Sequence, residues 1–399
     1  MSLKPAYKQT EIGVIPDDWQ TRRIDSFTSC TSGGTPSTLV AEYWGGPIRW
    51  MSSGELNLKR VREVDGRITE AGLHNSSTKM VPAKCVLIGL AGQGKTRGTA
   101  AMNFVELCTN QSIAAILPSK SHDSAFLYYV LDTKYEELRG LSDGGGGRGG
   151  LNLSIIKAIQ VTLPGINEQK AIAEALSDVD ALTDSLEALL TKKRNIKTGA
   201  MQELLTGRTR LPGFSGDWQE FRLENFADCF DHLRIPLNES ERSTAIGDYP
   251  YCGANGVLGF IDKYLIDDEM VLIAEDGGNF DEFATRPIAY KMSGKFWVNN
   301  HAHVLKAKPS QDNNYLYYSL VHKDVTPYLA SGTRAKLNKS EMWKIEIRAP
   351  KSSLEQEAIA EVLSDIDDEI QKLEKRLAKT RDLKQGMAQE LLTGRTRLV

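Results

Sequence analysis

Apolar residues recur at intervals of three and four over two long stretches of the chain, residues 168–205 and 355–392. In the second stretch the repeating positions are Ile359, Leu363, Ile366, Ile370, Leu373, Leu377, Thr380, Lys384, Met387 and Leu391. In the first they are Ile172, Leu176, Val179, Thr183, Leu186, Leu190, Lys193, Lys197, Ala200 and Leu204. An average spacing of about 3.5 residues over several heptads is typical of a coiled-coil seam. The pattern predicts two long paired helices; two ordinary core helices are the alternative.

The two stretches belong to one internal repeat. Residues 168–211 align without gaps to residues 355–398, and 27 of the 44 aligned positions are identical. The sequence near the start of each globular segment repeats as well, because Asp18-Trp19-Gln20 corresponds to Asp217-Trp218-Gln219. The chain is therefore a duplication, in which a variable globular segment is followed by a conserved helical one, twice.

The order of the segments predicts how the helices pair. The second globular segment leaves the end of the first helix and returns to the start of the second, and domain termini often lie close together. The helices should therefore run antiparallel, and the C-terminus should return to the N-terminus. We expect an α+β chain with a pseudo-two-fold, cyclic layout. Its globular domains are residues 1–165 and 212–350, and its helical spacers are residues 166–211 and 351–399.

Several phrases of the sequence resemble one protein family. They are "GGTPSTLVAEYWGGPIRWMSSGEL", "CTNQSIAAI", "YPYCGANGVLGFIDKYL", "KFWVNNHAHVL", "EQEAIAEVLSDID" and "LLTGRTRL". Together they resemble the specificity subunit of type I restriction–modification enzymes. The resemblance implies two target recognition domains, each of which reads one half of a bipartite site in double-stranded DNA. It also implies a complex with two adenine-methylating modification subunits, with translocating restriction subunits as further, optional partners.

Composition and charge limit the function classes. No apolar stretch approaches the ~20 residues of a membrane span, and five scattered cysteines without a CxxC pair suit a reducing cytoplasm. The formal net charge is −3. Residues 1–165 carry 18 Lys and Arg against 15 Asp and Glu, a balance of +3, whereas residues 212–350 carry 15 against 20, a balance of −5. A DNA-facing surface must then be locally basic, or a partner must supply positive charge.

A glycine-rich run allows two interpretations. Residues 89–96, "GLAGQGKT", match the P-loop pattern and follow a strand-like run. A P-loop must open into a helix, but Gly98 comes too early for one. The corresponding run of the second domain, residues 271–279, also passes from a strand into a glycine-rich turn, without the Lys-Thr pair. We favour a turn with one structural role in both domains.

Polar side chains on such turns are candidates for DNA contact. Asn and Gln can pair with adenine and Arg or Lys with guanine, while glycines let the backbone approach a phosphate. The alternative is that these side chains satisfy the backbone of their own turns. The candidate DNA-binding residues are Ser53, Gln93, Lys95, Arg97, Arg148, Asn255, Asn279, Asn300, His301 and Arg334.

Other residue groups have simpler interpretations. The aligned pairs Tyr128-Tyr129 and Tyr317-Tyr318 are expected to pack in the two cores. His301 and His303 would share one face of a strand, but no third metal ligand is evident, so we expect polar contacts there and no metal. We find no cofactor-binding or catalytic motif and expect a non-catalytic chain without a cofactor. The competing hypotheses are a coiled-coil P-loop ATPase and a bridging adaptor that does not bind DNA.

Overall fold

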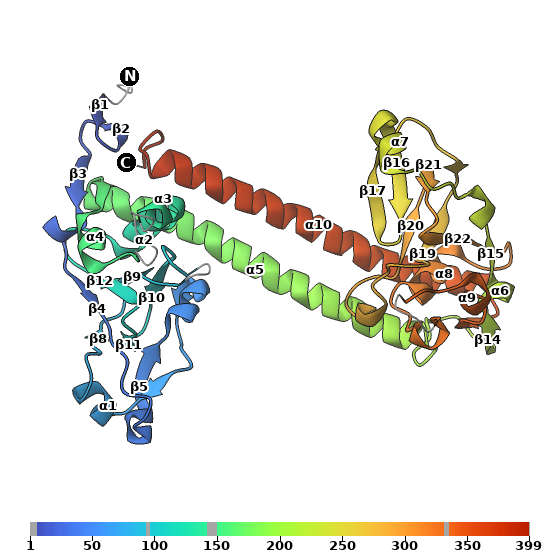
Figure 1. Cartoon of the computed structure of the whole chain (residues 1–399), viewed down its shortest axis with the longest axis horizontal. Helices are drawn as coiled ribbons and strands as arrows, with labels where there is room; N and C mark the ends of the chain where they lie inside the picture. Colours follow the sequence, from blue (N-terminus) through green and yellow to red (C-terminus); the bar gives the residue numbers. More distant parts are fainter. Residues whose placement is uncertain (1–5, 93–95, 142–149, 331–334, 399) are drawn as a thin grey trace. The chain divides into compact units, whose positions relative to one another are not determined.

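The computed structural model describes residues 6–92, 96–141, 150–330 and 335–398. The chain forms two compact units. The first unit contains the residues up to Ser185 together with those from Leu377 onward, and the second contains Leu186–Arg376. Two 39-residue helices, α5 (Ile166–Leu204) and α10 (Ser353–Leu391), each contribute one part to the first unit and the other part to the second (Figure 1). Each unit is therefore completed by residues from both copies of the repeat.

The first unit holds a five-stranded sheet of order β4-β12-β9-β10-β6 and a four-stranded sheet of order β7-β5-β11-β8, within its described residues. The strands of the larger sheet are β4 (Cys30–Ser32), β12 (Ile113–Ile116), β9 (Val86–Gly89), β10 (Ala100–Asn103) and β6 (Arg60–Val61). Those of the smaller sheet are β7 (Arg67–Ile68), β5 (Trp44–Met51), β11 (Leu107–Thr109) and β8 (Met80–Val81). Two short ribbons pair β1 (Tyr7–Thr10) with β2 (Gly13–Pro16) and β3 (Gln20–Arg23) with β13 (Gln160–Leu163).

The second unit repeats this topology. Its described strands form sheets of order β15-β22-β19-β20 and β17-β16-β21-β18 and a ribbon of β14 with β23. The first sheet contains β15 (Ala227–Cys229), β22 (Ala302–Ala307), β19 (Met270–Ala274) and β20 (Ala289–Met292). The second contains β17 (Gly256–Ile261), β16 (Ile246–Gly253), β21 (Lys295–Val298) and β18 (Ile266–Asp267), and the ribbon joins β14 (Trp218–Arg222) to β23 (Glu346–Pro350).

Short helices cover these sheets. In the first unit they are α1 (Glu70–His74), α2 (Ser124–Thr133), α3 (Tyr135–Gly140) and α4 (Leu153–Ala158); in the second they are α6 (Leu223–Phe226), α7 (Glu239–Thr244), α8 (Asn313–Leu320) and α9 (Lys339–Met342). An Asp side chain accepts from the backbone at the start of α2 and of α8, where Asp123 and Asp312 are the N-caps. The helices α2 and α8 therefore begin in the same way, as expected for copies of one element.

The core of each unit explains why its central strand is apolar on both faces. All four residues of β9 are buried. Val86 and Ile88 pack with Phe126 of α2, whereas Leu87 packs in a second cluster with Met51 on the opposite face. Strand β19 is likewise buried throughout. A strand covered on both sides has no polar face, so its sequence is a continuous apolar run rather than an alternation.

The two long helices pack as the periodicity predicted. Within the second unit, Lys193 and Lys197 of α5 pair with Glu369 and Asp367 of α10, so residue numbers fall along one helix as they rise along the other. In the first unit Lys384 pairs with Asp180 at 2.6 Å, in the same antiparallel sense. Nine apolar seam residues are buried: Ile172, Leu176, Leu186, Leu190, Leu204, Ile359, Leu363, Leu377 and Leu391. Four others, Val179, Ile366, Ile370 and Leu373, are partly exposed. The predicted antiparallel pairing is confirmed within each unit.

A tyrosine joins each globular part to its helices. The hydroxyl of Tyr129 donates to Asp180 at 2.7 Å, and that of Tyr318 donates to Asp367 at 2.8 Å. Lys384 and Lys197 bind the same two carboxylates. Both tyrosines belong to the aligned pairs whose packing role the sequence predicted, and that prediction is confirmed.

An arginine from the end of one repeat copy clamps the helix start of the other copy. Arg397 makes two hydrogen bonds to Glu168, of 2.6 and 2.9 Å, and also binds Asp18. Arg210 binds Glu355 in the same two-pronged way, with distances of 2.9 and 2.6 Å. The two glutamate side chains are only 5% and 1% exposed, so each depends on its arginine for a positively charged partner; the indole of Trp19 also donates to Glu168 at 3.1 Å.

The glycines of the repeated "LLTGRTR" phrase end the long helices. Gly207 and Gly394 have φ values of +70° and +72°, which favour glycine after a helix. A side chain on Gly394 would also meet Pro16 at 2.5 Å. The C-terminal segment thus turns back onto the N-terminal ribbon, and the predicted return of the C-terminus to the N-terminus is confirmed in the first unit.

We predict that Arg397→Ala lowers the free energy of unfolding of the first unit by about 3 kcal/mol, because the substitution leaves the buried Glu168 carboxylate without its positively charged partner. Urea unfolding monitored by tryptophan fluorescence measures the change. The matched control is Arg395→Ala, since Arg395 is 60% exposed and its nearest carboxylate is 3.6 Å away. A loss no larger for Arg397→Ala than for the control would contradict the clamp.

Candidate nucleic-acid interface

Three loops of the second unit converge, and they carry four of the predicted DNA-binding residues. The turn between β16 and β17 holds Asn255, the segment after β19 holds Asn279, and the turn before β22 holds Asn300 and His301. The Asn255 amide donates to the carbonyl of Gly277 at 2.9 Å. Strands β19 and β22 are neighbours, so their loops leave the same edge of the sheet. The structure therefore brings these residues into one surface.

The four side chains differ in what remains available to a ligand. Asn255 and Asn279 each donate to a backbone carbonyl, as the alternative interpretation of the sequence expected. The Nδ1 atom of His301 lies against the carboxylate of Asp276, which leaves Nε2 of a 41%-exposed side chain for another partner. Asn300 is exposed. Asn300 and His301 are therefore the best placed of the four to contact a base edge.

A charged cluster, in which His303 is buried and the other groups are partly exposed, lies next to these loops. Arg234 lies 3.1 Å from Asp231 and 2.5 Å from Glu275, and Lys336 lies 2.9 Å from Glu275. Burial alone would raise the pKa of Asp231, but hydrogen bonds and the neighbouring positive charges hold it at about 2. Burial would lower the pKa of His303, but its bond to Asp231 outweighs that effect and raises the pKa to about 9. None of these groups was predicted except His303, because they come from four separate segments.

In the first unit, two of the predicted DNA-binding residues, Ser53 and Arg97, lie within the described part of the chain. Ser53 begins a 3-10 helix, Ser53–Leu58, that lies beside the glycine-rich turn, since Leu56 is 3.1 Å from the position a side chain on Gly89 would take. Arg97 lies on that turn, and its Nε atom is buried. Ser53 and Arg97 are thus on adjacent segments. The predicted residues Gln93, Lys95, Arg148 and Arg334 lie outside the described residues.

The P-loop interpretation of the glycine-rich run is wrong. Strand β10 follows the run and pairs antiparallel with β9, where a P-loop would have a helix. The ends of the turn are joined as in a hairpin, because Gly98 donates to the carbonyl of Gly89 at 2.9 Å. In the second unit β19 and β20 pair in the same way around the corresponding segment. In both units the segment therefore connects two antiparallel strands.

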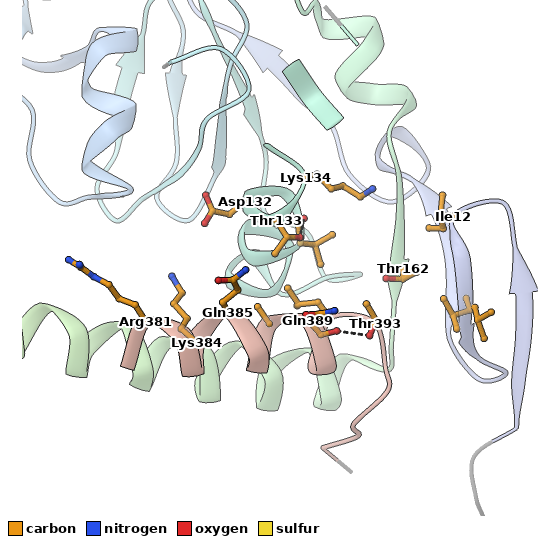
Figure 2. Close-up of a pocket in the computed structure, with 15 residues that line it drawn as sticks. Ile12, Asp132, Thr133, Lys134, Thr162, Arg381, Lys384, Gln385, Gln389 and Thr393 are labelled. Atoms are coloured by element: carbon orange, nitrogen blue, oxygen red, sulfur yellow. Dashed lines mark hydrogen bonds between the residues drawn. The ribbon is translucent and has the colours of Figure 1, made fainter. Parts of the chain in front are cut away.

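A groove lies beside the end of α10 in the first unit. Figure 2 shows Lys384, Gln385, Gln389 and Thr393 on one side of it, with Thr133 and Thr162 across from them. Its volume is about 640 Å³, and Val130 and Leu392 contribute apolar surface. A polar rim over an apolar floor is suited to an amphipathic helix.

The second unit has a matching groove of about 480 Å³ beside the end of α5. Its residues Lys197, Gln202, Leu205 and Thr206 are the repeat counterparts of Lys384, Gln389, Leu392 and Thr393. Each groove is also lined by the helix that follows an Asp N-cap, α2 in one unit and α8 in the other. The two grooves thus share these four positions of the repeat, while other residues that line them differ.

The sequence matches the model of a known family, the type I restriction modification DNA specificity domain, at residues 16–197 and again at residues 215–380. The chain belongs to this family. The two matches follow the duplication, so each copy is a specificity domain with its helical segment. Among the described residues, no helix is both long and apolar enough to cross a membrane.

Relatives and solved structures agree with this assignment. The chain is 33% identical over 184 residues to the MjaIX specificity subunit of a type I restriction enzyme from Methanocaldococcus jannaschii, which covers 45% of the chain and 42% of that protein. It is 22% identical over 422 residues to the MjaVIII specificity subunit of the same organism, with 96% and 94% covered. The chain spans less than half the length of several curated relatives that it matches, for example 37% of one from Haemophilus influenzae. The crystal structure of a type I restriction–modification S subunit from M. genitalium has the same fold, with a TM-score of 0.67 at 18% identity over 98% of this chain and 99% of that one.

Proposed function

We propose that this chain is the non-catalytic specificity subunit of a type I restriction–modification complex and recognises a bipartite site in double-stranded DNA. Residues 1–165 and 212–350 would each read one half-site, and residues 166–211 and 351–399 would separate the two readers. The observation that carries the proposal is the duplication itself: one specificity domain occurs twice, each followed by a copy of the same long helix. A bridging adaptor would not need two loop surfaces of this kind.

Readout rests on the loops rather than on net charge. In the second unit Asn300 and the Nε2 atom of His301 can reach base edges, while Arg234 and Lys336 are already paired with carboxylates. Residues 212–350 have a charge balance of −5, so phosphate contacts near this unit must come largely from a partner. Ser53 and Arg97 are the corresponding candidates in the first unit.

The matching grooves are our proposed docking sites for the methylating subunits. Because the two grooves present the same residue types from the two repeat copies, each can receive the same segment of one partner molecule. Two adenine-methylating subunits per chain follow from this arrangement. We infer that the complex acts in the cytoplasm, where chromosomal DNA is available and where five free cysteines remain reduced.

The function is tested by co-expressing the chain with the adjacent methylating subunit and mapping methylated adenines across the genome. We expect one motif made of two half-sites and a fixed gap. Asn300→Ala should relax one half-site and leave the other unchanged, with about ten- to a hundredfold less discrimination at the affected base. The same substitution at the exposed helical residue Asn195 is the control. Methylation without a motif, or with a motif that both variants leave unchanged, would refute the readout.

The spacing role of the helices has its own test. A helix of 39 residues is about 60 Å long, so inserting four residues after Lys192 of α5 should change the gap between the half-sites and preserve their sequences. Four residues inserted after Gly213, beyond the helix, should leave the gap unchanged. An unaltered gap in the helix variant would show that α5 does not set the distance.

The docking sites are tested by filling one groove at a time. Gln389→Arg and Gln202→Arg should each reduce the complex from two methylating subunits per chain to one, and the double variant should bind none, as measured by native mass spectrometry. The control is Gln371→Arg, which makes the same substitution on an exposed part of α10 outside the groove. If both groove variants keep two subunits, the partner docks elsewhere.

A further inference from the structure

One cluster of the second unit combines a thiol, a carboxylate and an imidazole, with the histidine buried and the other two residues partly exposed. Cys229 ends strand β15, Asp231 follows it, and His303 lies on the adjacent strand β22. The two strands pair antiparallel, with Cys229 opposite Leu305, so the cysteine and His303 lie near each other across the sheet. The ligand atoms of the three residues all lie within 4.8 Å of one another.

The histidine is oriented as a metal ligand is. Its Nε2 atom lies 2.9 Å from the carbonyl of Leu337, and because a carbonyl only accepts, Nε2 must carry the hydrogen. The Nδ1 atom therefore faces the cluster, 2.7 Å from Asp231. A backbone carbonyl on the far nitrogen is the usual outer partner that fixes the ring of a metal-binding histidine. His303 is 1% exposed, so the ring cannot turn away into solvent.

The spacing and chemistry of the donors suit zinc. A Zn²⁺ ion with bonds of about 2.3 Å to sulfur and about 2.1 Å to nitrogen and oxygen holds neighbouring ligand atoms roughly 3.5 Å apart. The ligand atoms of the cluster are 2.7 Å apart between His303 and Asp231 and at most 4.8 Å apart overall, a range that includes this value. Small side-chain movements would therefore bring the three residues to the distances of a zinc site. A carboxylate oxygen of Glu275 lies 3.7 Å from Nδ1 of His303 and is the nearest candidate for the fourth position.

Charged groups surround the three residues. Arg234 pairs with both Asp231 and Glu275, so these two carboxylates are held in place beside the cluster with or without an ion.

We propose that Cys229, Asp231 and His303 form a structural zinc site beneath the reading loops of the second unit. His303 is two residues from His301, so the ion would fix the base of the turn that holds Asn300 and His301. The site does not depend on the proposed DNA function, because it binds metal whether or not the loops read DNA.

The first unit provides an internal control. In its sheet Cys30 pairs with Ile116, as Cys229 pairs with Leu305. Two residues before Ile116 stands Ala114 in place of the histidine, and Ser32 stands in place of Asp231. The first unit therefore keeps the cysteine but lacks the other two ligands, and the proposal requires one ion per chain rather than two.

The test uses the full-length chain, purified without chelators, in two measurements. Elemental analysis by mass spectrometry should find one zinc per chain. After removal of zinc and addition of Co²⁺, the chain should show a sulfur-to-cobalt charge-transfer band in the near ultraviolet and the intense visible bands of a four-coordinate site. Absence of stoichiometric zinc together with absence of the cobalt band in the wild-type chain would overturn the proposal without any variant.

Variants then assign the ligands. Cys229→Ser should abolish the charge-transfer band, and His303→Ala should reduce bound zinc from one per chain to background, whereas Cys30→Ser should change neither. Circular dichroism confirms that each variant is folded; if His303→Ala is not, the conservative Cys229→Ser variant still decides. A band that persists in Cys229→Ser, or that disappears in Cys30→Ser, would place the metal elsewhere and refute the site.

Discussion

The structure depends on an ion pair between a buried carboxylate and an arginine at the start of each long helix. Glu168 and Glu355 lie where each helix meets its globular part, and a carboxylate removed from water is costly unless a cation accompanies it. Arg397 supplies that cation to Glu168, and Arg210 supplies it to Glu355. Each arginine comes from the end of the opposite repeat copy. Each unit therefore needs residues from both copies. The C-terminal segment of one repeat copy supplies the arginine that pairs with the buried glutamate of the other copy.

This exchange explains why so many features occur in matched pairs. The residue after each glutamate, Gln169 or Gln356, accepts from the backbone of the Asp that caps α2 or α8, at 2.8 and 2.9 Å. The adjacent Tyr–Asp–Lys contacts then fix the same short helix against the long ones. The position of each globular part on its helices is thus set by hydrogen bonds from residues of the repeat, and the loops are free to differ.

The two units differ where a reader of two different half-sites would need to differ. Their sheets have the same strand order at their centres, but the interior beneath the loops is apolar in one unit and charged in the other. Ala114 stands in the first sheet where His303 stands in the second. His303 pairs with Asp231 and Glu275, and Glu275 also pairs with Arg234. A duplicated scaffold can vary in this way because the backbone pairing of β12 or β22 does not depend on the side chain at that position.

The sequence by itself determined the elements whose causes are local. The helices α5 and α10 follow from a spacing that every heptad repeats, the buried strands β9 and β19 from short apolar runs, and the duplication from identity over 44 aligned positions. Gly207 and Gly394 end their helices for an equally local reason, because the positive φ of this turn favours glycine. The family also followed from the sequence, since its phrases are contiguous.

Only the tertiary structure decided which distant residues meet. The clamp of Arg397 on Glu168 joins residues 229 positions apart, and the meeting of Asn255 with Gly277 depends on where two hairpins end. The glycine-rich run matched a P-loop letter for letter, yet the antiparallel pairing of β10 with β9 made it a hairpin. Cys229 and Asp231 could not be assigned to His303 from spacing, because strand register brought them together. Local patterns report interactions within a few residues, whereas a site depends on register and packing across the whole fold.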